Sequence, residues 1–352
     1  MSQLPMIFMP ILGVLLIILP FVPTLIEFFR KTDSKPLKIS DHLLKDPRSN
    51  PDHVFWHFAN LISLENVANL AKKIATNAPY FITESSWAVP EGLLPSPPKG
   101  TSRVISSGSL TLTPKTRYLT KILSLGSIQT AKDNALHEIH ALEKLTLQTR
   151  NRVIWWASGK NIVIHDQCRL PGKTVAKVEI QLAGNIWFHL LDAPLIRSDL
   201  AKVRSSSSPQ ELVPHADKVR TIIQGDYILE KGTILRSELI VRGNLLVHSG
   251  AEIHGDVKCH GDFILAIGAQ IFGNLVGMGN GMLQGENFVS GSLLTQKTLK
   301  IAASCQIGSP THLVTLSALT MRIAGPFQGH GVIRAWKSGN FTPEMAAISA
   351  LL

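Results

Sequence analysis

The fold of this chain is decided by residues 224–292, which read QGDYILEKGTILRSELIVRGNLLVHSGAEIHGDVKCHGDFILAIGAQIFGNLVGMGNGMLQGENFVSGS. A turn signal recurs in this stretch every 18 residues. Four pairs of glycine with Asp or Asn carry it: Gly225-Asp226, Gly243-Asn244, Gly261-Asp262 and Gly279-Asn280. Two ladders of glycines keep the same step: Gly232, Gly250 and Gly268, then Gly255, Gly273 and Gly291. Three ladders in phase predict a repeating structure in which every repeat has three corners.

The corners and the residues between them have a simple physical interpretation. Glycine can adopt the positive φ of a sharp turn, and a neighbouring Asp or Asn tolerates or hydrogen-bonds such a turn. About five residues remain between corners, which is a usual strand length. Stacking brings equivalent residues about 4.8 Å apart, so apolar residues at the same step form columns that no single repeat could bury. The sequence therefore predicts a mainly β fold, a parallel β-helix solenoid with triangular coils of 17–18 residues.

Length and composition limit the class of protein. A chain of 352 residues exceeds an average domain, although a solenoid can absorb the length as one elongated unit. The content of 45% hydrophobic and 17% charged residues favours a packed core plus a membrane segment over a disordered chain. The net charge of +10 favours anionic partners such as phospholipid, nucleic acid or acidic polysaccharide. The three cysteines have no paired spacing, which argues against a disulfide framework or a zinc site and is consistent with a reducing compartment.

Residues 1–29 are predicted to form a transmembrane anchor. The run from Leu4 to Ile26 contains no charged residue, and a helix of this length spans about 34 Å, enough for a bilayer core. The alternative is a cleaved signal peptide, but no basic residue precedes the run and no cleavage motif follows it. The basic residues after the span predict a single pass through a bacterial inner membrane, with the bulk of the chain in the cytoplasm. These residues are also candidates for lipid or partner contacts: Arg30, Lys31, Lys35 and Lys38.

The rest of the chain divides by composition into further segments. Residues 30–100 are expected to form a juxtamembrane tether, two short helices between Asp52 and Ala78, and a proline-rich linker without regular structure over 88–100. A looser repeat predicts a first β-helix section at 101–197, and the regular section covers 218–341, followed by a capping helix at 342–352. The serine-rich residues 198–217 either separate two solenoids or form a loop in one. Because continuity avoids exposing two extra ends, the sequence favours one solenoid with an insertion.

The regular coils resemble those of the bactofilins, a bacterial family of polymer-forming cytoskeletal proteins. The similarity is carried by Ile223-Gln224-Gly225-Asp226, Val241-Arg242-Gly243-Asn244 and Ile253-His254-Gly255-Asp256-Val257. The earlier half, including Asp46-Pro47-Arg48 and residues 141–157, is similar to longer membrane-anchored members of this group. The resemblance implies a right-handed β-helix that assembles end to end, without nucleotide, at the inner face of the cytoplasmic membrane. The spanning helix, the extra solenoid section and the serine-rich segment depart from the compact family pattern.

Positive charge concentrates in the first β-helix section, where Lys115, Arg117 and Lys121 lead a basic group. The functional interpretation is a surface facing anionic lipid or an acidic partner, and the alternative is a solvated basic face. Nucleic acid is not expected as a partner, because the charge is dispersed and no aromatic platform is interleaved with a basic run.

Enzymatic and metal-binding alternatives find weak support in the sequence. His248, His254 and His260 fall on successive faces of one coil, whereas metal ligands must lie about 2 Å from one point. A left-handed hexapeptide-repeat acyltransferase acting on sugar nucleotides is the strongest enzyme alternative, but its six-residue spacing is met only once, at Gly255 and Gly261. A polysaccharide lyase would need a cleft of stacked charged residues, and none appears. No residue is nominated as catalytic, cofactor-binding or metal-binding.

These observations together predict a non-enzymatic, membrane-anchored β-helical scaffold. We expect it to bind further copies of itself and membrane lipids. The anchor would hold a cell-envelope or polysaccharide-synthesis protein in place.

Overall fold

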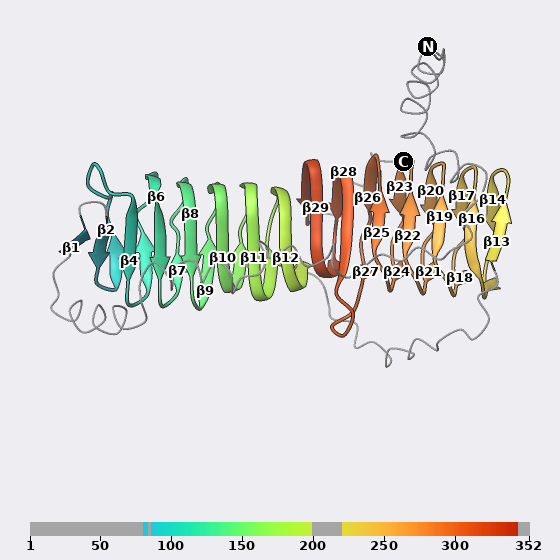
Figure 1. Ribbon diagram of the computed structural model, residues 1–352, viewed down its shortest axis with the longest axis horizontal. Coiled ribbons are helices and arrows are strands. Elements are labelled where there is room, and N and C mark those ends of the chain that lie inside the picture. Colours follow the sequence, from blue (N-terminus) through green and yellow to red (C-terminus); the bar gives the residue numbers. More distant parts are fainter. Residues whose placement is uncertain (1–79, 84–85, 199–219, 344–352) are drawn as a thin grey trace, which may run out of the picture. The chain divides into compact units, whose positions relative to one another are not determined.

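The predicted solenoid is confirmed by the computed structural model, which describes residues 80–83, 86–198 and 220–343 (Figure 1). All of them belong to the unit Leu44–Leu352. The described residues form strands and turns without a helix and wind into a β-solenoid of about 13 turns. The expected anchor, tether and helices before residue 80 and the capping helix after residue 343 lie outside the described residues.

The first section is a stack of coils that runs from Tyr80 to Ser198 and is coloured blue to yellow-green in Figure 1. Its strands are β1 (Tyr80–Thr83), β2 (Ser86–Val89), β3 (Gly92–Leu94), β4 (Arg103–Ser106), β5 (Leu110–Leu112), β6 (Arg117–Ser124), β7 (Ile128–Gln129), β8 (Ala135–Ala141), β9 (Lys144–Leu147), β10 (Arg152–Ile164), β11 (Cys168–Leu182) and β12 (Ile186–Ser198). Parallel pairing joins β6, β8, β10, β11 and β12 in that order. The long strands β10 to β12 pass around corners without a break. Shifts in the register of their pairing mark the positions of these corners.

The second section winds from Arg220 to Thr342. Its strands are β13 (Arg220–Ile223), β14 (Tyr227–Leu229), β15 (Ile234–Leu235), β16 (Glu238–Val241), β17 (Leu245–Val247), β18 (Glu252–Ile253), β19 (Val257–Cys259), β20 (Phe263–Leu265), β21 (Gln270–Ile271), β22 (Leu275–Gly277), β23 (Gly281–Leu283), β24 (Phe288–Val289), β25 (Leu293–Thr295), β26 (Thr298–Ile301), β27 (Cys305–Ile307), β28 (Val314–Ala324) and β29 (Phe327–Thr342). From β13 to β27 every third strand pairs in parallel, so that Tyr227 lies beside Leu245 and Leu245 beside Phe263. The coil step is therefore the 18 residues that the glycine ladders predict.

The two sections meet through their last coils. Strand β12 of the first section pairs with β29 of the second in antiparallel register, from Ile186 opposite Phe341 to Arg197 opposite Gln328. Strand β13, which follows β12 in the chain, pairs only with β16 among the described strands (Figure 1). The expectation of one continuous winding with an inserted loop is therefore wrong. The extra ends that argued for it are avoided differently, because the two terminal coils cover each other.

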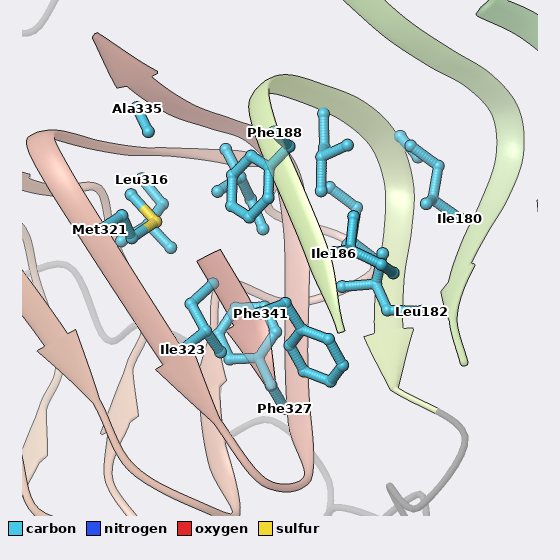
Figure 2. Close-up of a cluster of buried hydrophobic side chains, with 14 of the residues drawn as sticks. Ile180, Leu182, Ile186, Phe188, Leu316, Met321, Ile323, Phe327, Ala335 and Phe341 are labelled. Carbon is cyan, nitrogen blue, oxygen red and sulfur yellow. The ribbon is translucent and has the colours of Figure 1, made fainter. Parts of the chain in front are cut away.

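The core continues through this junction. Figure 2 shows Ile186 and Phe188 of β12 facing Phe341, Phe327 and Ile323 of the second section, and all five side chains are buried. Away from the junction, each coil of the second section adds one residue to each apolar column. One such column is Leu229, Val247, Leu265, Leu283 and Ile301. A single hydrophobic cluster of buried residues therefore spans both sections.

The first section begins earlier than the sequence predicts. The proline-rich residues 88–100 were expected to lack regular structure, but β2 and β3 lie within or overlap this range and pair in parallel with β4 and β5. Leu94 is buried although Leu93 is exposed, which is the alternation of a strand that covers the core on one side. Prolines 95, 97 and 98 follow directly after β3 and leave this short strand intact.

Candidate functional site

The Gly-Asp/Asn pairs form a hydrogen-bonded ladder along one corner of the second section. The Oδ1 atom of Asp226 accepts from the backbone N–H of Asn244 at 2.7 Å. The same contact joins Asn244 to Asp262 at 2.9 Å and Asp262 to Asn280 at 2.7 Å. Each acidic or amide side chain thus satisfies a backbone donor of the next coil, which links successive corners.

The glycines of the two main ladders serve different purposes. Gly232, Gly250 and Gly268 have φ values of 68°, 67° and 73°, as a turn glycine requires. The glycines that precede Asp or Asn do not have a positive φ, so that explanation is wrong for them. At Gly261 a Cβ atom would lie 2.7 Å from the carbonyl oxygen of Gly243 in the preceding coil. These positions need glycine because the backbones of adjacent coils approach closely.

The same left-handed corner occurs in the first section without glycine. Lys115, Asp133, Arg150 and Gln167 adopt it with φ values from 54° to 63°, and Glu286 and Ser304 continue it in the second section. The glycine ladders could not reveal these corners. The one signal was a pair of polar residues, Asp133-Asn134 and Arg150-Asn151, repeated at an interval of 17.

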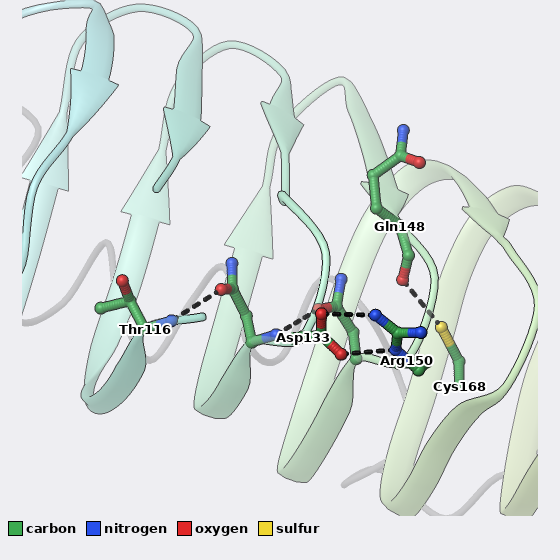
Figure 3. A network of polar contacts seen from close by, with 7 residues as sticks. Thr116, Asp133, Gln148, Arg150 and Cys168 are labelled. Carbon is green, nitrogen blue, oxygen red and sulfur yellow. Dashed lines mark hydrogen bonds and ion pairs between the residues drawn. The ribbon is translucent and has the colours of Figure 1, made fainter. Parts of the chain in front are cut away.

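Buried amides support these corners from inside. Oδ1 of Asn134 accepts from the backbone N–H of Thr116 at 3.1 Å, and Oδ1 of Asn151 accepts from the N–H of Asn134 at 2.8 Å. Outside, the guanidinium of Arg150 bridges to the carboxylate of Asp133 (Figure 3). The corners of the first section are therefore held by a ladder equivalent to that of the second section, built from different residues.

The cysteines occupy interior positions. All three are free thiols. Cys168 takes the position of Asn151 in the next coil, and its Sγ donates to the carbonyl of Gln148 at 3.1 Å (Figure 3). Burial raises the pKa of Cys168 to about 11 and that of Cys305 to about 12. These thiols stay protonated at neutral pH, which makes them poor nucleophiles and poor metal ligands.

The basic residues expected to contact lipid or a partner are placed differently from one another. Lys115 is exposed at a left-handed corner, and Arg117 is exposed on the adjoining strand. Lys121 pairs with Glu138, with 2.9 Å between Nζ and Oε2. Arg30, Lys31, Lys35 and Lys38 lie outside the described residues.

Of the three histidines considered as metal ligands, His248, His254 and His260, the last two point to separate partners. His254 stacks on Phe272 and lies 2.9 Å from a carboxylate oxygen of Glu252. His260 lies beside Arg242 at 3.4 Å. In the ranges that the structure describes, no group of three or more His, Cys, Asp or Glu side chains is placed to hold a metal ion.

One cluster resembles a catalytic arrangement. The Nδ1 atom of His140 lies 2.7 Å from Oγ of Ser158, and its Nε2 atom lies 3.7 Å from Oε1 of Glu138. Burial alone would raise the pKa of Glu138, but His140 and Lys121 outweigh it and lower the pKa to about 2. Burial lowers the pKa of His140, which keeps the imidazole neutral. Because Ser158 and His140 are both buried, a substrate could not reach the hydroxyl, and the cluster is best understood as structural.

A groove of about 430 Å³ opens at the junction of the two sections. Its lining includes Arg150, Arg152 and Arg169 from the first section, Trp187 of β12, and Asn340 of β29. The groove therefore combines guanidinium groups with one indole ring, and it has contributions from both sections.

Two of the groove arginines, Arg152 and Arg169, belong to a longer column that only the strand register reveals. Arg117 and Arg152 flank Ala135, Arg169 follows Arg152, and Trp187 follows Arg169. Across the junction, Trp187 lies opposite Asn340, which neighbours Arg322. No Asp or Glu interrupts this column.

Comparison with protein-family models, with curated proteins and with solved structures found no match. Among the described residues, no helix has the length and apolar character required to cross a membrane.

Proposed function

We propose that the protein is a non-enzymatic scaffold of the polymer-forming, bactofilin-like type. In this proposal residues 1–29 anchor a right-handed solenoid at the cytoplasmic side of a bacterial inner membrane. Copies of the solenoid associate and position a cell-envelope or polysaccharide-synthesis protein. The support comes from the coil formed by β13, β14 and β15, which we call the open end.

In the residues that the structure describes, the open end has a neighbouring coil on one side only. Within the described part of the chain, β13, β14 and β15 each pair with one strand only, β16, β17 and β18. Ile223, Tyr227 and Leu235 are only partly buried there, whereas the core residues of the next coil, such as Leu239 and Val241, are fully buried. A terminal coil with unpaired strand edges and a half-exposed core is a template for another chain.

Gly225 is the observation that favours association most directly. Gly243, Gly261 and Gly279 cannot accept a Cβ because the preceding coil touches them. Gly225 occupies the same position in the open end, and a Cβ there would meet nothing within 4 Å. A glycine required for coil-to-coil contact thus occurs where the described residues supply no coil to contact. A second copy stacked on the open end would supply one.

The junction inside the chain shows that such an end can be covered. β12 and β29 end two separate solenoid sections, and they bury each other's cores through antiparallel pairing. Two open ends from two copies could pair in the same manner without any new type of contact.

Replacement of Gly225 by Leu tests this proposal. We expect the wild-type chain lacking residues 1–29 to form filaments or paired solenoids in negative-stain electron microscopy. The Gly225→Leu chain should remain monomeric with an unchanged melting temperature, because no described residue lies within 4 Å of a Cβ at this position. Gly243→Leu, in contrast, should unfold the solenoid, since overpacking costs at least about 1–3 kcal/mol.

Ile267→Lys is the matched surface control, because Ile267 is exposed on an inner coil away from the open end. It should assemble like the wild type. Assembly that survives Gly225→Leu would contradict stacking at the open end. Discrete trimers that bind acyl-CoA or a sugar nucleotide would instead support the left-handed acyltransferase class.

A further inference from the structure

One corner of the solenoid carries exposed large apolar side chains in both sections. Of the eleven such residues in the described ranges, four lie on this corner. They are Leu119 and Trp155 in the first section and Leu319 and Trp336 in the second, with exposed fractions between 46% and 65%. We call this set the aromatic edge.

The strand register places these four residues on one corner. A shift in strand register marks each place where the chain bends around this corner. One shift lies between Tyr118 and Lys121 and contains Leu119. Another shift lies between Val153 and Trp156 and contains Trp155. The bend continues at His189 of β12. Across the junction, the corresponding bend of β29 contains Trp336, beside Leu319 of β28.

The two indole rings are held in fixed positions. Trp155 stacks on His137 with 5.7 Å between ring centroids. The guanidinium carbon of Arg334 lies 4.9 Å from the ring centroid of Trp336, and Nε1 of Trp336 donates to Ser317 at 3.1 Å. Exposed tryptophans that are ordered in this way lose little further entropy on binding.

The arginine column runs beside this edge. It consists of Arg117, Arg152, Arg169 and Arg322, all exposed and none in an ion pair within the described ranges. Together with Ala135, Trp187 and Asn340 it occupies one outward position per coil. At about 4.8 Å per coil, the six steps from Arg117 to Arg322 extend about 29 Å. The edge and the column therefore form a strip that is apolar on one side and cationic on the other.

We infer that this strip docks the solenoid along the surface of an anionic membrane. Tryptophan and leucine side chains enter the interfacial region of a bilayer, while neighbouring arginines attract anionic headgroups. A corner is convex, which suits a planar surface. A single-stranded nucleic acid would need several aromatic rings along a basic groove, whereas the groove that Arg152 and Arg169 line has one aromatic ring that is not buried, that of Trp187. This inference stands apart from self-association and does not require that residues 1–29 span the membrane.

A fluorescent probe on the edge tests the inference in the full-length chain. Leu319→Cys introduces an exposed thiol for an environment-sensitive fluorophore, while Cys168, Cys259 and Cys305 are buried and will not be labelled. The chain is reconstituted into phosphatidylcholine vesicles with and without phosphatidylglycerol. We expect a blue shift and quenching by brominated lipid only when phosphatidylglycerol is present. The same probe at Ile267→Cys, exposed on another face, should not respond.

Charge reversal distinguishes an effect of the arginine column from an effect of the overall net charge of the protein. Arg152→Glu, Arg169→Glu and Arg322→Glu should each weaken the response to phosphatidylglycerol at least about fivefold, the effect of one charge near the surface. A triple variant, Lys144→Glu, Lys231→Glu and Arg236→Glu, at exposed positions outside the column and the edge, makes the same change in net charge as reversal of all three column arginines and should leave the response intact. Equal probe signals in both vesicle types would overturn the inference. A signal caused by an added oligonucleotide or polyuronate but not by lipid would overturn it as well.

Discussion

Asp192 shows how strongly a single carboxylate can depend on its position in a coil. It lies in the column that includes Ser158 and Val175, and burial raises its pKa to about 6 against the opposing charges of Lys173 and Arg334. Glu138, two residues before His140 of the same column, has its pKa lowered to about 2. Glu138 therefore stabilises the fold above pH 4.5 and loses this effect as the pH falls towards 2, whereas Asp192 destabilises the fold above pH 6.

Asp192→Asn should stabilise the protein at neutral pH. The folded carboxyl has a higher pKa than the unfolded one, so ionisation costs stability that is fully felt above pH 6 and vanishes below about pH 4. The gain should reach up to about 3 kcal/mol at pH 7.5, since one pKa unit corresponds to about 1.36 kcal/mol. Thermal unfolding of both proteins at pH 7.5 and pH 4 measures it. An equal gain at both pH values would show that the charge of Asp192 is not the cause.

At the scale of the element, the junction of β12 and β29 joins two otherwise separate solenoid sections. Phe188 fills the space above Gly339, where a Cβ would lie 2.5 Å from the ring. His330 adds a polar contact, with 2.9 Å between Nδ1 and the carbonyl oxygen of Pro194. The junction therefore combines strand pairing, apolar packing and side-chain hydrogen bonds.

Phe188→Ala should weaken this junction. Loss of a buried phenyl ring costs about 3–5 kcal/mol, and here it also removes contacts between the sections. We expect denaturant unfolding, followed by circular dichroism, to change from one transition to two as the sections lose their coupling. Phe272→Ala, at a partly exposed ring stacked on His254, is the matched control and should retain one transition. A single, unshifted transition for Phe188→Ala would argue against coupling through β12 and β29.

The strands of the second section could be predicted from the sequence because close coil contacts there demand glycine, and glycine is easily recognised. The first section was harder, since Lys115, Asp133, Arg150 and Gln167 make the same corners without it. The junction could not be predicted, because its partners, such as Trp187 and Asn340, are separated in the sequence by most of the second section. No local sequence pattern indicates a contact between residues so far apart. Arg117 was recognised from the sequence as a candidate for lipid or partner contacts. That it belongs to the arginine column follows only from the register of the strands, which the sequence does not give.

At the scale of the whole molecule, the last coils of the two sections pair with each other through β12 and β29, which we call the tail-to-tail arrangement. This arrangement determines which surfaces are available. It buries the last coil of each section, leaves the coil of β13 to β15 with a neighbour on one side only in the described structure, and aligns the corners of both sections into one edge. Both proposals follow from this geometry, self-association from the open end and membrane docking from the edge. A single continuous winding would have produced neither the same end nor the same edge.

Cross-linking between β12 and β29 tests this arrangement most directly. Trp187 and Asn340 are outward-facing partners, and antiparallel partners have Cα atoms about 4.5–5.5 Å apart, within reach of a disulfide. Oxidation of a Trp187→Cys, Asn340→Cys double variant should give an intramolecular disulfide of high yield, seen as a faster band on a non-reducing gel. A Trp187→Cys, Ile222→Cys variant, which joins β12 to the strand that follows it in the chain, should remain reduced. A disulfide in the second variant and none in the first would contradict the tail-to-tail fold.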